Sequence, residues 1–581
     1  MSLFSLRWLA LAGLFLAVAA VPAQPPAKGK APPAKEEEDP AAKPVKPPPS
    51  LEDAPKADAT PAEGPGEPPP AGVLVVGVNS LPVLMSPQFA RTDSEKFALD
   101  LLFEGLLRPG IDGAGGRVYE PALARELPTL VPLGREFTLT NAAWGEPDQQ
   151  GLPVTAADVV STFEKLKARQ GQPGAEVADW IDSVKTVATN RCTITLTRGH
   201  IDPLSLMTFK VLPSNQKDDL AFARKPVGSG PFVYAGRQTK GGRVYAIFPA
   251  NPAYRRPDPP KLSAVWMVAT RNPVADFKSK LFHFALTTHT GQLAALKPPP
   301  QPVGGQVGKL EVNIGNLGHV DTVFSRRIYL LAVNHQSAKL GEGEKGRELR
   351  KFLAHAIQRD AILTACFRAG FGEHHQPLTG PFLPNTWPCN GALAGRLDDP
   401  DLARSLRSRE AGKVDLVLKY PAGDPAVAEA CKLMAQQVAE ANAGVTLKPT
   451  PVAADDYYQQ IVYNTDFDLA YWHYDYPNDW FSPAGLLDSS ARGHGGRNFM
   501  RYTPSSAIND LLVKCQDRRE FGVVQQAMRQ LHTTFGYEVP FIPLWHLDTH
   551  ALLAVGLETV PPAPQLDPLA PFTHIEQWSV H

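Results

Sequence analysis

The sequence predicts an α/β protein of at least two lobes. Short apolar runs that suit buried strands alternate with amphipathic helical patterns from Val73 onward. No internal repeat organises this alternation, and 581 residues are enough for several domains with a large core. We therefore expect a mixed fold in which more than one lobe combines strands and helices.

The N-terminal region has a different composition from the rest of the chain. Residues 1–23 predict a signal peptide, because Arg7 precedes an apolar run and small residues at 21–23 offer a cleavage site. An uncleaved membrane anchor is the alternative. Residues 24–72 are rich in Pro and almost free of large apolar side chains, which predicts a disordered tether. The folded part is then 73–581, in an exported protein that is periplasmic or otherwise extracytoplasmic.

In the first half of the folded part, Val73–Val78 is almost continuously apolar and predicts a buried strand. Thr92 and Glu95 form a capping-box pattern ahead of a helix whose apolar positions run from Phe97 to Leu106. Thr155 opens a second helix. Further strands are predicted at Phe137–Leu139, Thr193–Thr197 and Val265–Val268, and residues 290–320 predict a loop with short strands.

The second half continues the alternation. Residues 326–334 predict a buried strand ending in Asn334, and Arg347–Arg359 has the clearest helical periodicity of the chain. Val539–Trp545 predicts a late strand, which its two prolines favour at a sheet edge. Between these elements the sequence predicts a strand at Asp415–Lys419, a helix at Pro425–Ala441 and a strand at Val445–Pro449.

The stretch from Asp466 to Phe481 combines carboxylates with aromatic rings. It begins with the alternation of a strand and continues into a loop that carries Asp475 and Asp479 among tyrosines and tryptophans. A desolvated carboxylate needs a cation, and ring faces attract cations, so the stretch suits a ligand with an ammonium end and an apolar body. The alternative is a buried strand that leaves the core through a polar turn.

Several landmarks occur in a characteristic order along the chain. They are residues 74–79, 102–107, 120–124, 153–160, 227–232 and 350–360, and then Phe467-Asp468-Leu469 followed by Trp472 and Asp475. In this order and spacing the chain resembles the extracytoplasmic solute-binding proteins of ABC importers, in the large family that binds oligopeptides, dipeptides and nickel chelates.

The resemblance implies a two-lobed, hinged periplasmic-binding-protein fold of class II type, with a small extra domain inserted in lobe one. Lobe one would comprise 73–110, 205–320 and 540–581, the inserted subdomain 111–204, and lobe two 321–539. It also implies a monomeric receptor, not an enzyme, that holds a peptide or peptide-like solute between the lobes and delivers it to an inner-membrane ABC permease.

The resemblance also assigns the site. Asp475 would pair with the α-amino group of a peptide, Trp472 and Tyr474 would form walls, and Asn334 would donate or accept a hydrogen bond. Arg326 or Arg327 would meet a ligand carboxylate. From its position beside this site, His473 would either tune ligand charge with pH or simply pack against its neighbours. The chain departs from the family pattern after Trp144, at Gln358 and at 280–286, so the ligand is expected to differ from those of relatives, or to be lost.

Other functions find less support in the sequence. The 58 basic and 59 acidic residues balance, which argues against nucleic-acid partners. Five separated cysteines without CxxC give no zinc or redox signal, and we expect no metal or cofactor. His374 and His375 are interpreted as an exposed loop rather than metal ligands, and Asp466 and Asp468 as strand residues rather than a glycosidase pair. Two alternatives stay open: a tethered binding or scaffold module that lost transport, and, least favoured, a secreted hydrolase.

Overall fold

A computed structural model of the protein describes residues 70–112, 116–145, 151–254, 258–293, 296, 312–372, 374–393, 397–406, 412–441, 444–492 and 495–581. All of them belong to one of two contact-defined units, Val45–His581. The predicted signal peptide and nearly all of the predicted tether lie outside the described residues. Within the described part of the chain, no helix combines the length and apolar character needed to cross a membrane.

The first sheet has eight strands and is built around β1 (Val73–Val78), as the apolar run predicts. All six β1 residues are buried, because β10 and β11 pair with the strand in parallel on its two sides. The strand order is β12 (Val312–Asn313), β13 (Gly318–Val323), β20 (Thr549–Ala554), β11 (Phe284–Thr287), β1, β10 (Ala264–Ala269), β9 (Arg243–Pro249) and β8 (Arg237–Lys240).

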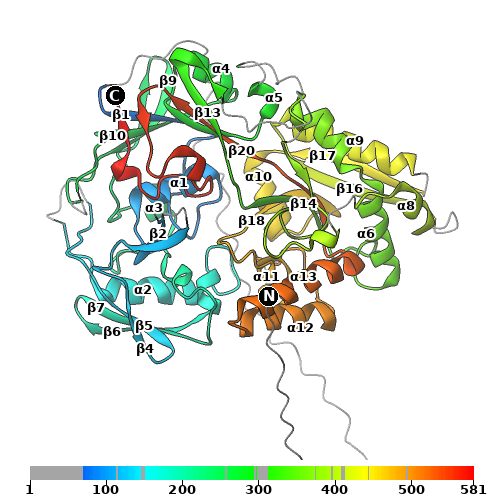
Figure 1. Cartoon of the computed structure of the whole chain (residues 1–581), viewed down its shortest axis with the longest axis horizontal. Coiled ribbons are helices and arrows are strands. Elements are labelled where there is room, and N and C mark those ends of the chain that lie inside the picture. The colour runs from blue at the N-terminus through cyan, green and yellow to red at the C-terminus, as the bar shows by residue number, and fades with distance from the viewer. Residues whose placement is uncertain are drawn as a thin grey trace, which may run out of the picture. The chain divides into compact units, whose positions relative to one another are not determined.

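The second sheet has six strands, with β14 (Arg327–Val333) and β18 (Leu469–Asp475) at its centre (Figure 1). The remaining strands are β15 (Gln376–Pro377), β19 (Ile542–His546), β16 (Val414–Pro421) and β17 (Val445–Val452), in the order β15-β19-β14-β18-β16-β17. The predicted strands at 326–334, 415–419, 445–449 and 467–472 all fall in this sheet. Its two faces carry two large apolar cores.

A four-stranded antiparallel sheet lies between β3 and α3 in the sequence. Its order is β4 (Thr129–Val131), β5 (Gly134–Thr138), β7 (Arg191–Leu196) and β6 (Ile181–Ala188), and α2 (Ala156–Lys167) packs against it (Figure 1). Two-stranded sheets pair β2 (Leu107–Ile111) with β3 (Arg117–Pro121) and β21 (Leu557–Glu558) with β22 (Ser579–Val580).

The chain crosses between the two large sheets at two short connections. β13 and β20 belong to the eight-stranded sheet, whereas β14 and β19 belong to the six-stranded sheet. The connections are therefore residues 324–326 and 547–548. They meet, because His546 Nδ1 lies 3.0 Å from the carbonyl oxygen of Arg327. The predicted boundaries assign β19 to lobe one, whereas β19 pairs with β14 in the six-stranded sheet. The lobe boundaries themselves remain a prediction.

The helices are α1 (Asp93–Leu102), α2, α3 (Leu220–Arg224), α4 (Pro273–Lys278), α5 (Thr290–Leu293), α6 (Glu344–Ala356), α7 (Arg359–Leu363), α8 (Pro400–Leu406), α9 (Pro425–Glu440), α10 (Ala454–Tyr458), α11 (Ala484–Leu487), α12 (Ser506–Asp517) and α13 (Phe521–Glu538). The helices predicted near 92, 155, 347 and 425 are present, and the structure adds others that the sequence did not predict, among them the long α12 and α13. The capping box at Thr92 is confirmed: the Glu95 backbone N–H donates to the Thr92 hydroxyl, and the Glu95 carboxylate accepts from the Thr92 N–H.

Two predictions about elements of the second half are wrong. The helix predicted over 347–359 ends at Ala356, and the buried Arg359 begins α7 instead. Its guanidinium donates to the carbonyls of Ala354, Ile357 and Pro543, so its hydrogen bonds hold the break between the helices. The late strand is not an edge strand either, because β19 pairs with β14 on one side and with the short β15 on the other.

Candidate functional site

The predicted binding stretch begins on β18, whose last residue is Asp475. β18 runs antiparallel to β14, and the register places Arg327 directly opposite Asp475 and Tyr329 opposite His473. Because directly opposed side chains in such a pair lie on the same face, the first residue of one strand and the last of the other form a charge pair. The structure thus brings three predicted site residues together: Asp475, Arg327 and His473.

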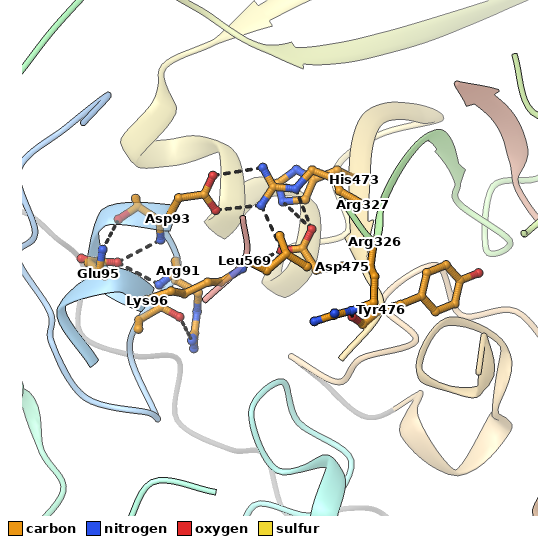
Figure 2. Close-up of polar contacts among 12 residues, drawn as sticks. Arg91, Asp93, Glu95, Lys96, Arg326, Arg327, His473, Asp475, Tyr476 and Leu569 are labelled. Atoms are coloured by element: carbon orange, nitrogen blue, oxygen red, sulfur yellow. Dashed lines mark hydrogen bonds and ion pairs between the residues drawn. The ribbon is translucent and has the colours of Figure 1, made fainter. Parts of the chain in front are cut away.

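Helix α1 adds two more charges to this point, as Figure 2 shows. Arg327 Nε lies 2.6 Å from Asp475 Oδ1, and Lys96 Nζ lies 2.8 Å from Asp475 Oδ2. The two terminal nitrogens of Arg327 also donate to both carboxylate oxygens of Asp93, at 3.0 and 2.7 Å. We call Asp93, Lys96, Arg327 and Asp475 the charged tetrad. Such forked Arg–carboxylate pairs are among the strongest hydrogen-bonded ion pairs in proteins.

The charges around this point shift the pKa values of Asp475, Asp93 and His473. Burial opposes ionisation of Asp475, but the charges of Arg327 and Lys96 outweigh it and hold the pKa of this carboxyl well below its usual range. Burial likewise opposes ionisation of Asp93, yet Arg327 and Lys96 lower its pKa to about 2. Burial and the charge of Arg327 lower the pKa of His473 to about 4. At neutral pH Asp93 and Asp475 are therefore ionised and His473 is neutral.

A second ion network lies next to the tetrad and is centred on Arg326. Its side chain is 6% exposed; Nη2 lies 2.7 Å from Asp567 Oδ2, and Nη1 lies 3.5 Å from Asp479 Oδ1. Arg117 Nε reaches Asp479 Oδ2 at 2.8 Å. Arg326 Nε also donates to the carbonyl of Tyr476, which follows Asp475 (Figure 2). Asp479 and Arg326 are thus already paired within the chain.

The predicted aromatic walls lie on the other side of β18. Because alternate residues of a strand point to opposite faces, Trp472 and Tyr474 face away from His473 and Asp475. Trp472 stacks on Tyr457 with 5.8 Å between ring centroids and an angle of 26°. Tyr474 packs edge-on against Tyr476 at 5.0 Å. Both rings pack against one core of the six-stranded sheet.

Asn334 lies at the opposite end of β14 from Arg327, so it is remote from the tetrad. Its side-chain amide donates to the carbonyls of Thr465 and Phe467, and its oxygen accepts from the Gln336 N–H. Its amide nitrogen therefore holds the chain that enters β18, whereas its oxygen closes the turn that follows β14. In this structure Asn334 positions the strand on which Asp475 lies.

The adjacent histidines are not on an exposed loop, which corrects the sequence interpretation. His375 is 0% exposed and His374 6%. They lie where the chain crosses between the sheets: the His375 N–H donates to Asp548, and His374 Nδ1 lies 3.2 Å from the same carboxylate. His355 instead contacts the Leu397 carbonyl. Among the described residues, no group of three or more His, Cys, Asp or Glu side chains could hold a metal ion.

The remaining candidates for catalysis have structural partners. Asp466 pairs with Lys419 at 2.7 Å, whereas Asp468 pairs with Lys339 at 3.0 Å and accepts the Val417 N–H. Each carboxylate is thus neutralised by its own lysine. The five cysteines are all free.

Sequence reasoning missed Asp93 and Lys96. Asp93 follows the Thr92 cap and was visible only as part of a helix start, and Lys96 is 379 residues from Asp475 in the sequence. No local pattern links residues so far apart.

The sequence also did not predict a pocket of about 610 Å³, which is lined by residues of 376–391 and by Arg529. One of its lining residues, Trp387, donates its indole N–H to the Asp479 carbonyl.

Comparison with known proteins now decides the family. Residues 121–494 of the 581 match the profile described as "Bacterial extracellular solute-binding proteins, family 5 Middle". The chain belongs to this family. The family relation expected from the ordered landmarks is confirmed. No curated protein matches the chain.

Solved structures of family 5 type proteins share the fold. The oligopeptide-binding protein AppA from Bacillus subtilis, in complex with a nonapeptide, gives a TM-score of 0.70 at 18% identity, covering 89% of this chain and 100% of AppA. NikZ from Campylobacter jejuni, in complex with Ni(L-His), gives 0.68 at 18%, covering 88% and 100%. MoaA from A. tumefacien R10, in complex with mannopinic acid, gives 0.71 at 22%, covering 88% and 99%. These matches confirm the two-lobed solute-binding fold; the family and fold are those of receptors.

Proposed function

We propose that this family 5 protein is the extracytoplasmic receptor of an ABC importer, which binds a peptide or peptide-like solute between its lobes and delivers it to an inner-membrane permease. Asp475 would accept the solute's ammonium group and Arg327 would meet a carboxylate. No bond is made or broken in this role.

The observation that carries the proposal is the position of Asp475. Its side chain is 17% exposed and lies between β14 of the six-stranded sheet and α1, which packs on the eight-stranded sheet. A carboxylate in such a place is held ionised only by cations, so it is suited to a cationic guest. Proteins of similar fold are solved in complex with a nonapeptide, Ni(L-His) and mannopinic acid, which supports a peptide or another small solute as the ligand.

The test is calorimetric titration of a peptide library against the wild type and Asp475→Asn. We expect the variant to bind at least about 30-fold more weakly, because removing one partner of a buried charge pair costs about 2–5 kcal/mol. Asp415→Asn is the matched control, since Asp415 forms an exposed ion pair with Lys448 on the same sheet. Equal affinity of wild type and Asp475→Asn for a bound peptide would remove Asp475 from the site.

A second candidate function is favoured by one observation. Asp475 and Arg327 are already neutralised within the chain, which also suits a binding or scaffold module that keeps the fold without transport. Permease and ATPase genes beside the gene for this chain would favour import. Their absence, together with no solute in the mass spectrum of the purified protein, would favour the module.

A further inference from the structure

The tetrad connects two separately built bodies of the protein. Phe97 and Leu101 of α1 pack in the same core as Leu74 and Val76 of β1, in the eight-stranded sheet. Arg327 and Asp475 end two paired strands of the six-stranded sheet. The Lys96–Asp475 and Asp93–Arg327 pairs therefore join the two lobes directly.

The two α1 charges have the chemistry of a zwitterion. Asp93 and Lys96 are three residues apart, so they project from the same side of the helix and present a carboxylate and an ammonium together. They meet Arg327 and Asp475, which carry the opposite charges in matching positions (Figure 2). The tetrad as a whole has two positive and two negative groups and is neutral.

The exposed fractions of the four side chains show which two can separate from the tetrad when the lobes open. The side chains of Asp93 and Lys96 are 40% and 35% exposed, whereas those of Asp475 and Arg327 are 17% and 13% exposed. Asp475 and Arg327 also hold each other across the strand pair. When the lobes part, the α1 side chains can return to water, and the Asp475–Arg327 pair stays intact.

We propose that Asp93 and Lys96 form a latch that closes the two lobes in the absence of solute, and that a solute displaces the latch with an ammonium and a carboxylate of its own. This inference rests on the proposed function and narrows its solute to compounds that carry both an ammonium and a carboxylate, as a dipeptide with free termini does. Such a solute restores two opposite charges opposite Asp475 and Arg327. A simple amine or a simple acid would leave one unbalanced charge in a partly buried site, which is costly.

The latch itself is tested by small-angle X-ray scattering of the full chain, stripped of copurified solute by unfolding and refolding. We expect the Asp93→Asn/Lys96→Met double variant to show a larger radius of gyration than the wild type. The matched control is Asp415→Asn/Lys448→Met, which removes an ion pair within one sheet. Thermal unfolding verifies that each variant is folded.

Competition is tested by calorimetry with three probes: a dipeptide, its N-acetyl form and its C-terminal amide. We expect the double variant to bind the dipeptide at least about fivefold more tightly than the wild type, because the latch no longer competes. The two blocked probes should bind both proteins more weakly than the dipeptide.

The outcomes separate the latch from the proposed function. Identical scattering of wild type and double variant, or weaker dipeptide binding by the double variant, overturns the latch. If the double variant expands but no probe binds to either protein, the latch is upheld. The same result contradicts the proposed peptide-like solute.

Discussion

His532 is 1% exposed and has no charged partner among the described residues. Its Nδ1 accepts the backbone N–H of Asn390, and Nε2 lies 3.3 Å from the Thr379 hydroxyl. Burial lowers the pKa of His532 to about 4 from the ordinary 6.5. The ring is therefore neutral in the folded protein over a range of pH in which the unfolded chain would bind a proton.

The free energy of unfolding should fall as the pH drops from 6.5 toward 4, because the unfolded state gains a proton that folded His532 does not take. The loss is at most about 1.4 kcal/mol per pH unit for this group. His532→Asn keeps an acceptor near Nδ1 and removes the titration, so its stability should fall less steeply over this range. Urea unfolding at pH 7, 5.5 and 4.5 measures both slopes, and parallel slopes would contradict the prediction.

Individual residues show which parts of the candidate site could be predicted from the sequence. Asp475 stood out in the sequence as a candidate site residue because carboxylates among rings are unusual and because the family landmarks surround it. Arg327 was also a candidate, but its pairing with Asp475 could not be predicted because strand register sets it, and Lys96 was missed because packing of α1 brings it there. His374 and His375 were misjudged for the same reason: their burial comes from the connection at Asp548, far away in sequence.

Glu95 decides the position of α1 and therefore of the latch. Besides its part in the capping box, its carboxylate accepts the backbone N–H groups of Leu84 and Arg91, at 2.9 and 2.8 Å. The side chain is buried, so one residue ties the helix start to the loop that precedes it.

We expect Glu95→Ala to lower the free energy of unfolding by about 3 kcal/mol or more, because each buried N–H left without an acceptor costs about 1–3 kcal/mol. Glu344→Ala is the control: it removes a first-turn glutamate of α6 that is exposed. Urea unfolding of the two variants measures the difference. Similar losses for both would show that the Glu95 contacts contribute little.

Some regular elements were predictable from local signals: β1 from its apolar run, α2 from its cap at Thr155 and β14 from its apolar strand pattern. The end of α6 was not, since the apolar pattern continues to Ile357 while the buried Arg359 stops the helix through tertiary hydrogen bonds. The two prolines of the late strand also misled, because Leu330 pairs with Pro543 at a register shift that accommodates the missing N–H.

The six-stranded body is a closed insertion in the chain. The buried members of its two cores all come from residues 328–547, and its first and last strands pair with each other. The whole segment 324–548 therefore carries its own core and has adjacent ends. This is what an autonomously folding domain requires.

We expect a fragment of residues 324–548 to fold alone, with cooperative urea unfolding followed by circular dichroism. A fragment of the same length, residues 357–581, would lack β14 and should show no cooperative transition. A broad, non-cooperative profile for 324–548 would mean that its cores depend on the eight-stranded sheet.

The meeting of the two connections has a pharmacological consequence. Any opening must turn about residues 324–326 and 547–548, which lie side by side at the hydrogen bond between His546 and Arg327. Phe324 is 53% exposed there and lies beside His546. In the proposed receptor role, an antibody fragment or small compound bound at Phe324 would block this motion and act as a remote inhibitor that does not compete with the solute.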